Sequence, residues 1–363
     1  MAKSVSSARF SAARIGLLHG RFPTRRRETI ENEQFAVFGK NGDRSSGALS
    51  ISTQVVEQSV DLDADFLITD LAPTDMLRQR IGRLWRHDRM NRKATEPRVL
   101  IVYPRETVEI DGEESGDASF KTRLEADVYV CAPYILWRTA EVWGKLEKIV
   151  APTDVRRLLE ATYEDRDETE PDAAAMFSEM SAKVEKMRNR VGALSCSGVL
   201  PPLSYAECHT RYNDTPSVDV LPLLDGDFGK KAPTITLFDG REVKLDKRWR
   251  FCDAVALART KISCRKNARL DAVCPTCRKK DLTSQISRVY NILRETYFKF
   301  SENLAPLLIG AETGELSTLD EAATPFRYTD ELGFFEEKSG DATLWREGAT
   351  NEDDGGCDEE FEW

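Results

Sequence analysis

The stretch TQVVEQSVDLDADFLITDLAPTDMLRQRIGRLWRHDR, residues 53–89, is the most strongly patterned part of the chain and decides its fold. It contains an apolar run, DFLITDLA (65–72), which predicts a strand. PTDMLRQRIGRLWR (73–86) follows directly, and its apolar residues recur at helical spacing. Pro73 and Thr74 are typical of a helix start. A strand followed by a helix is the repeating unit of a parallel α/β sheet.

The flanking segments repeat this alternation over residues 1–104. Strands are predicted at IGLLHGRF (15–22), GALSISTQ (47–54) and PRVLIVYP (97–104), and a helix at TRRRETIENEQFAVFG (24–39). We therefore predict an α/β lobe with a parallel sheet. Its functional loops are expected at the carboxyl ends of the strands.

The helix predicted at 73–86 has a basic face that suits a phosphate group. Gln79, Arg83 and Arg86 are spaced i, i+4 and i+7, and Gly82 would let a ligand approach closely. Guanidinium groups bind phosphate through two hydrogen bonds and stay charged in any site. The alternative interpretation is an ordinary solvated basic face.

Polar residues also gather where the preceding strand ends. Thr53 and Gln54 close that strand, and Asp61 follows in an acidic loop. Nucleotides commonly bind α/β sheets at such strand ends. Asp61 suits a ribose hydroxyl, and Thr53 and Gln54 suit a nucleic-acid backbone. The alternative is that the acids cap a short helix and solvate a loop.

The two segments resemble motifs V and VI of superfamily 2 helicases, carried by TQVVEQSVDLDADFLITDLAP and QRIGRLWRH. Together with LLHGRFPTRRRETIE (17–31), they resemble the CRISPR-associated helicase–nuclease of type I interference systems. This resemblance covers about residues 15–104. DVRRLLEATYED (154–165) and RYTDELGF (327–334) extend it more loosely.

The resemblance implies a second RecA-like helicase lobe that works with a first lobe, with ATP and Mg²⁺ between them. It also implies single-stranded DNA across both lobes, an HD nuclease, and recruitment by an RNA-guided surveillance complex. Arg83 and Arg86 would be arginine fingers, with Gln79 near the γ-phosphate. Asp61, with Gly82 nearby, would contact the nucleotide, and Thr53 and Gln54 would contact DNA.

The sequence departs from the family in what it lacks. It has no GxxxxGK[ST] loop. DEAA (320–323) resembles a magnesium-binding motif, but no apolar strand precedes it. Three histidines, His19, His87 and His209, are too few for an HD nuclease. The chain is therefore expected to begin inside the second lobe, bind ATP and Mg²⁺ mainly through a missing lobe, and show negligible ATPase activity alone.

Two explanations of this departure stay open. The chain is either a fragment of a split gene, or one subunit whose ATP-binding lobe and HD nuclease lie on a separate protein. The corresponding function is the C-terminal part of an ATP-dependent DNA helicase in CRISPR antiviral interference. The alternatives are a non-catalytic nucleic-acid- or complex-binding remnant and a superfamily 2 helicase fragment outside CRISPR.

After the lobe, we predict an acidic linker or insertion at 105–120, a mostly helical accessory domain at 121–338 and an acidic disordered tail at 339–363. Cys274 and Cys277 form a CxxC pair, with Cys252 and Cys264 upstream. Zinc ribbons usually need two such pairs, so both zinc binding and ordinary reduced cysteines stay open.

The charge is distributed unevenly along the chain. The formal net charge is −10, yet residues 241–281 carry 13 basic and 5 acidic side chains. A basic patch acts locally, so this stretch, with Trp249 and Phe251, suits either single-stranded nucleic acid or a solvated face. No apolar run reaches the roughly 20 residues of a membrane helix, and scattered cysteines favour a reducing cytoplasm.

Overall fold

The computed structural model describes most of the chain between residues 14 and 337. The described ranges are 14–44, 47–57, 61–90, 92, 94–104, 108–110, 113–115, 120–124, 131–196, 217–229, 232–246, 248–274, 284–299, 303–310 and 313–337. The predicted tail at 339–363, the N-terminal residues 1–13, His209 and Cys277 lie outside them.

The first parallel pair of strands is built as the sequence predicts. β1 (Arg14–Leu18) pairs in parallel with β2 (Ala48–Ser52), and the helix α2 (Thr24–Phe38) connects them. Ile30 of α2 packs with Leu18 and Phe22 in a small buried cluster. The buried Gln34 accepts a hydrogen bond from Ser50 Oγ at 2.8 Å, so a polar contact also fixes α2 over the strands.

A second parallel pair is formed by β3 (Phe66–Asp70) and β4 (Arg98–Val102), with the helix α3 (Thr74–Ile81) between them. The predicted parallel α/β arrangement is confirmed, although these strands form two separate pairs. One face of the second pair is open to solvent, and its large apolar side chains are Phe66, Ile68, Leu100 and Val102. Parallel sheets usually have both faces covered, so this open face is unusual.

The predicted helix at 73–86 is too long. α3 ends at Ile81, and Gly82 caps it by donating its N–H to Arg78 O. Ala64 N–H donates to Arg83 O at 2.7 Å, and Trp85 N–H donates to Ala64 O at 3.0 Å. These contacts with a distant segment replace the helical hydrogen bonds. Gln79, Arg83 and Arg86 therefore do not share one helix face.

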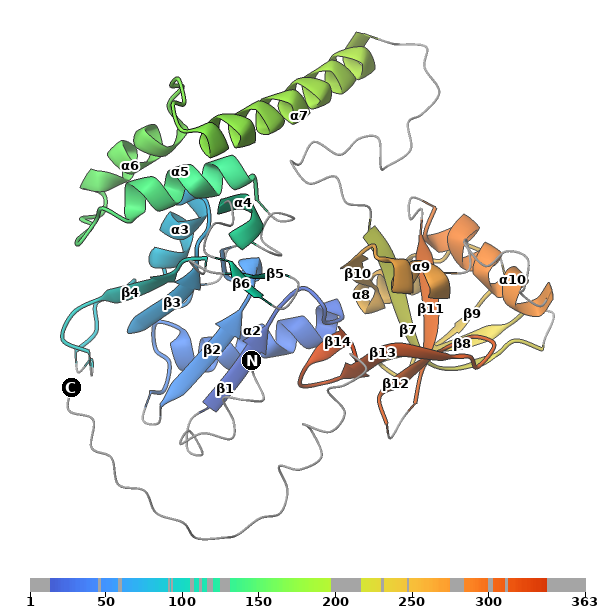
Figure 1. Cartoon of the computed structure of the whole chain (residues 1–363). Helices are drawn as coiled ribbons and strands as arrows, with labels where there is room; N and C mark the ends of the chain where they lie inside the picture. The colour runs from blue at the N-terminus through green and yellow to red at the C-terminus, as the bar shows by residue number, and fades with distance from the viewer. Residues whose placement is uncertain are drawn as a thin grey trace.

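The predicted helical region after the lobe agrees with the described residues 120–124 and 131–196. It comprises α4 (Phe120–Arg123), α5 (Pro133–Trp143), α6 (Thr153–Tyr163) and α7 (Pro171–Cys196). The predicted acidic insertion before it contains a short antiparallel hairpin, β5 (Val108–Ile110) with β6 (Glu113–Ser115). Figure 1 shows α5 and α6 lying over α3 of the lobe. Among the described residues, no helix is both long and apolar enough to span a membrane.

A buried hydrogen-bonded trio joins these helices to the lobe. Trp143 Nε1 of α5 donates to Thr74 Oγ1 of α3 at 2.8 Å, and Thr74 Oγ1 lies 2.6 Å from Thr162 Oγ1 of α6. Leu77 and Leu158 pack beside them. Because all three polar groups are buried and paired, the start of α3 is fixed against α5 and α6.

The prediction of a mostly helical accessory domain is wrong beyond residue 217. An eight-stranded sheet fills this region in the order β14-β13-β12-β11-β7-β8-β9, with β10 also paired to β7. Its strands are β7 (Ser217–Asp227), β8 (Thr234–Leu237), β9 (Glu242–Lys244), β10 (Ile262–Arg265), β11 (Leu304–Ile309), β12 (Glu315–Thr318), β13 (Ala323–Thr329) and β14 (Gly333–Glu336).

Helices cover this sheet and complete two apolar cores. They are α8 (Phe251–Thr260), α9 (Ala268–Val273) and α10 (Ser284–Ile292), which continues into a π-helical turn, η4 (Leu293–Tyr297). Leu221 and Leu223 of β7 belong to the core with α8 and α10, whereas Val218 and Val220 belong to the core with α9. The central strand β7 is therefore buried on both sides.

The sheet domain contacts the lobe through the turn between β13 and β14 (Figure 1). Phe334 N–H donates to Arg21 O at 2.8 Å, and His19 Nε2 lies 3.1 Å from Leu332 O. Gly333 has a φ of +68°, and a Cβ there would lie 2.6 Å from Arg21 O. Only glycine fits both the conformation and the space. His19, stacked on Phe22, thus belongs to a domain contact.

A buried carboxylate fixes the segment that leads into β3. Asp63 has no exposed surface and accepts hydrogen bonds from Arg89 Nε and Arg92 Nη2, each at 2.9 Å. Arg44 lies 3.5 Å away, and the backbone N–H of Arg86 donates to Asp63 at 2.8 Å. Burial opposes the charge, but the arginines outweigh it and hold the pKa of Asp63 below its usual value.

We predict that Asp63→Asn lowers the free energy of unfolding by about 3 kcal/mol, because it removes the carboxylate that pairs with Arg89 and one of the two that pair with Arg92. Urea unfolding monitored by circular dichroism would measure this loss. Since the folded-state pKa is lowered, the contribution of Asp63 is present above the unfolded carboxyl pKa. It disappears as the pH falls through the folded one.

The matched control is Glu96→Gln, which removes a carboxylate from an exposed pair with Arg98. That change should alter stability by less than about 1 kcal/mol. Equal stability of Asp63→Asn and the wild-type protein at neutral pH would show that the arginines do not depend on this carboxylate.

Candidate functional site

The carboxyl end of β2 presents two polar side chains to solvent. Thr53 follows the last residue of β2, and its N–H donates to Leu18 O of β1 at 3.2 Å. Gln54 opens a short 3-10 turn, η1 (Gln54–Glu57). Both residues are exposed. The structure thus places them as predicted, on a strand end where a ligand can reach their side chains.

Asp61 lies between two basic side chains from the segment that follows α3. Arg86 Nε is 2.6 Å from Asp61 Oδ1, and His87 Nε2 lies 3.0 and 3.1 Å from the two carboxylate oxygens. About 40% of both the Asp61 and the Arg86 side chain is exposed. Asp61 can therefore exchange a hydrogen bond with an incoming ligand without unfolding the loop.

Arg83 lies near the same loop, and its hydrogen bonds within the described part of the chain go to backbone oxygens. Its Nε donates to Val56 O at 3.3 Å, and its Nη2 donates to Glu57 O at 3.2 Å. Burial lowers the pKa of Arg83, the nearby Arg86 lowers it further, and Asp61 raises it in part. A lowered pKa caused by burial and a second cation indicates a place where an added anion would be stabilised.

A neighbouring ion pair, which the sequence did not reveal, fixes the geometry of this site. Arg80 of α3 donates from Nε to Glu57 Oε1 at 2.8 Å and from Nη1 to Thr69 Oγ1 at 2.7 Å. It thereby joins α3, η1 and β3. The carbonyls of Val56 and Glu57 that hold Arg83 are positioned by this contact.

Gln79 lies in the last turn of α3, and Gly82 caps the end of this helix. Both precede Arg83 and Arg86 in the chain. The Gln79 side chain is half-buried, and no contact brings it to Asp61 or Arg83 in the described part of the chain. Gly82 has an ordinary helical φ of −62°. A Cβ at Gly82 would lie 3.3 Å from Arg78 O, so its small size serves the helix end itself.

The described residues offer no cluster of three or more metal-ligating side chains. Cys252 is exposed, whereas Cys264 and Cys274 are buried. Cys274 Sγ donates to Leu304 O at 3.5 Å, and burial raises the pKa of Cys264 to about 12. Both buried thiols behave as core residues. Because Cys277 lies outside the described residues, zinc binding and ordinary reduced cysteines both stay open for the pair Cys274 and Cys277.

The residues that come together are therefore Arg83, Arg86 and Asp61, close to the exposed end of β2. Arg86 pairs with Asp61, and Arg83 lies close enough to both for their charges to shift its pKa, so two cations stand near one carboxylate. This arrangement suits a ligand with several anionic oxygens, such as a polyphosphate, with a hydroxyl able to reach Asp61. The described residues around this cluster do not form a comparable site for a magnesium ion.

Known proteins resemble this chain both in sequence and in fold. Residues 1–89 match the family described as CRISPR-associated nuclease/helicase Cas3, C-terminal. A CRISPR-associated endonuclease/helicase Cas3 of Thermus thermophilus is 39% identical over 151 residues, which are 41% of this chain and 15% of that protein. The match thus spans under a fifth of that curated relative.

The fold extends this likeness to most of the chain. The crystal structure of T. fusca Cas3-ATP has a TM-score of 0.59 and 24% identity, covering 89% of this chain and 35% of that one. A chain in a structure entitled CRISPR RNA-guided surveillance complex, pre-nicking, has a TM-score of 0.58 and 21% identity, covering 92% and 42%.

At these identities, the structures show the fold alone. They confirm a RecA-like fold for the lobe at the start of the chain, and the likeness extends over most of the chain. The resemblance stated from the motifs is confirmed: residues 1–89 carry the sequence pattern of the C-terminal portion of the Cas3 helicase–nucleases of CRISPR systems, and the chain shares their fold.

Proposed function

We propose that this chain serves as the C-terminal part of an ATP-dependent DNA helicase in CRISPR antiviral interference. Arg83 and Arg86 act as arginine fingers on a nucleotide that a first lobe holds. The observation that carries this proposal is the pairing of Arg86 with Asp61 beside Arg83, whose hydrogen bonds among the described residues go to backbone oxygens. Those weak contacts are readily exchanged for phosphate oxygens.

The division of labour follows from the charges of the site. The chain supplies positive charge from the two arginines and a carboxylate, Asp61, that can accept a hydrogen bond from a ribose hydroxyl. Gln79 of α3 would add a polar side chain. It does not supply a magnesium site among the described residues. In phosphoryl transfer the metal and the phosphate-binding loop hold the nucleotide, and arginines stabilise the developing charge. ATP and Mg²⁺ would accordingly be held mainly by the first lobe.

The partners follow from the same proposal. Single-stranded DNA would cross the exposed end of β2 at Thr53 and Gln54. The Cas3 relative solved in an RNA-guided surveillance complex supports a similar recruiting complex for this protein. A separate protein would carry the ATP-binding lobe and HD nuclease if the motor is split. The expected compartment is the cytoplasm, where such DNA and complexes meet.

A second function, a non-catalytic binding module, is favoured by one observation. Arg83 already has hydrogen-bond partners within the chain, and Arg86 is paired with Asp61. The site is therefore stable without a nucleotide, as it would be in a protein that only binds nucleic acid or the surveillance complex. A helicase fragment outside CRISPR would share the site but would not bind such a complex.

We predict that DNA-stimulated ATP hydrolysis appears only when the chain is mixed with a protein that carries the ATP-binding lobe. Arg83→Ala or Arg86→Ala should lower the turnover rate of the mixture by about a thousandfold, because arginine fingers contribute about that factor. Arg83→Lys should recover only part of it, since lysine lacks the planar fork of arginine. Phosphate release would measure the rate.

The control is Arg78→Ala, which removes an exposed arginine from α3, outside the cluster. This variant should retain the turnover of the wild-type mixture. Full activity of Arg83→Ala and Arg86→Ala would disprove the arginine-finger role. Hydrolysis by the chain alone that depends on Arg83 would show that it holds the nucleotide itself.

We also predict that Thr53→Ala combined with Gln54→Ala raises the DNA concentration needed for half-maximal ATPase stimulation by about fivefold. Each lost hydrogen bond to the DNA backbone should contribute about 0.5–1.5 kcal/mol. The turnover rate at saturating DNA should stay unchanged, because neither residue touches the nucleotide. A lower rate at saturation with unchanged DNA requirement would contradict this placement.

A further inference from the structure

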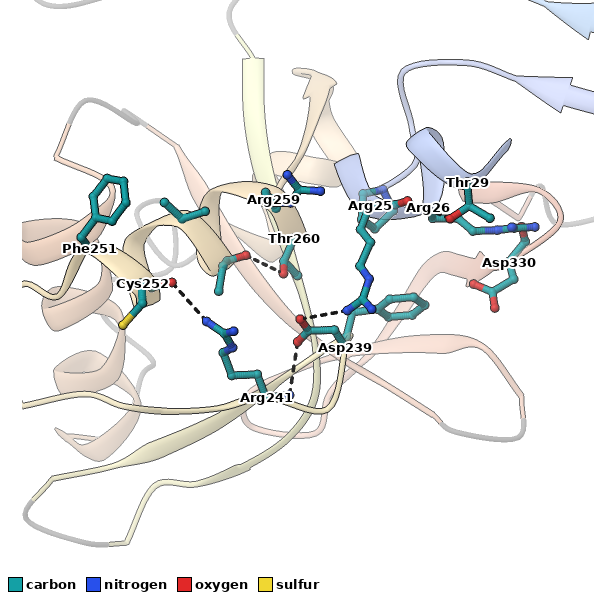
Figure 2. Close-up of a pocket in the computed structure, with 14 residues that line it drawn as sticks. Arg25, Arg26, Thr29, Asp239, Arg241, Phe251, Cys252, Arg259, Thr260 and Asp330 are labelled. Atoms are coloured by element: carbon teal, nitrogen blue, oxygen red, sulfur yellow. Dashed lines mark hydrogen bonds and ion pairs between the residues drawn. The ribbon is translucent and has the colours of Figure 1, made fainter. Parts of the chain in front are cut away.

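A groove of about 770 Å³ lies where α2 of the lobe meets α8 of the sheet domain. Figure 2 shows its lining, with α2 on one side and α8 and the turn between β8 and β9 on the other. Its volume is in the range of about 300–1,000 Å³ that is typical of ligand sites. The groove is separate from the arginine cluster at Asp61, because none of its lining residues belongs to that cluster.

Four arginines line the groove, against two aspartates. Arg25 Nη1 lies 3.4 Å from Asp239, and Arg26 Nε donates to the backbone oxygen of Asp330 at 3.0 Å. Arg241 Nη1 donates to Cys252 O at 3.3 Å, and Arg259 pairs with Glu28 of α2. Arg25 and Arg241 are well exposed and are held by long contacts, so both can turn toward an anion.

Aromatic side chains stand at the α8 end of the same groove. Phe251, the first residue of α8, is 71% exposed and lines the groove. Trp249 is 59% exposed, and the two ring centroids are 6.1 Å apart. Together the two rings form an exposed aromatic patch. Their flat faces are available for stacking.

We propose that this groove binds single-stranded nucleic acid, with Arg25 and Arg241 on phosphates and a base stacked on Phe251. The combination of guanidinium groups with an exposed aromatic ring favours nucleic acid over an acidic peptide, which would need only the charges. The proposal rests on the proposed function for its substrate class. It adds a second contact that only the packed lobe and sheet domain provide together.

The groove takes two basic side chains from the stretch at 241–281, in a protein with a net charge of −10. Arg259 contacts Glu28 of α2, and Arg241 lines the groove. Arginines from two distant parts of the sequence thus create one local positive field. Such a field acts on the backbone charges of a strand within a Debye length of about 8 Å.

Binding of a labelled single-stranded thymidine oligonucleotide to the full chain, followed by fluorescence anisotropy over a range of salt concentrations, tests the proposal. Arg25→Ala combined with Arg241→Ala should weaken binding by at least about tenfold and reduce the salt slope by about 1.4, since each phosphate contact contributes about 0.7. Phe251→Ala should weaken binding by about tenfold without changing the slope.

Arg156→Ala is the matched control, because Arg156 is exposed on α6 and pairs only with Glu160 among the contacts described. It should bind like the wild-type chain. A thermal melt of each variant separates lost binding from lost folding. Failure of the wild-type chain to bind the oligonucleotide, or wild-type affinity in the groove variants, would overturn the proposal.

Two further comparisons distinguish this proposal from the proposed function and from binding of an acidic peptide. If only Thr53→Ala with Gln54→Ala weakens binding, the groove proposal fails while the proposed function stands. If polyglutamate competes as well as an oligonucleotide of equal charge, and Phe251→Ala has no effect, the groove binds acidic peptide instead. Loss of Arg83-dependent hydrolysis alone would not affect the groove, because its binding is measured without nucleotide.

Discussion

The arrangement of the lobe depends on the buried carboxylate of Asp63. It receives charged hydrogen bonds from Arg89 and Arg92 and a backbone hydrogen bond from Arg86. A charge without solvent contact is stable only when paired in this way. The pairing holds the loop before β3 against the segment after α3. Asp61 lies on the first of these segments and Arg86 on the second. The buried contacts of Asp63 therefore also bring Asp61 and Arg86 together.

Much of the lobe could be predicted because its signals are local. The alternation of strands and helices, and the start of α2 at Thr24, follow from short patterns. The end of α3 does not, because it depends on the pairing of Leu84 with Ala64. Asp63 looked like part of a solvated acidic loop, since its arginine partners lie 26 and 29 residues away. Long-range pairing outweighed local preference in both cases.

The sheet domain was mispredicted for the same physical reason. Its central strands β7 and β11 pair in parallel although most of the domain lies between them in the chain. Short apolar runs do not show whether they form buried strands or buried helix segments. Of the site, Gln79, Arg83 and Arg86 were predicted on one helix face, which the end of α3 at Ile81 prevents, whereas the two motif segments do meet where Arg86 pairs with Asp61. The groove residues on α2 and α8 were not grouped, because only domain packing brings them together.

The open face of β3 and β4 has a consequence for handling the protein. Phe66, Ile68, Leu100 and Val102 contact water there. Sulfate strengthens the burial of apolar surface, whereas any salt weakens contacts between arginine and phosphate. One addition to the buffer therefore drives this face toward self-association while it releases bound nucleic acid. Precipitation by ammonium sulfate should accordingly remove nucleic acid from the protein in the same step.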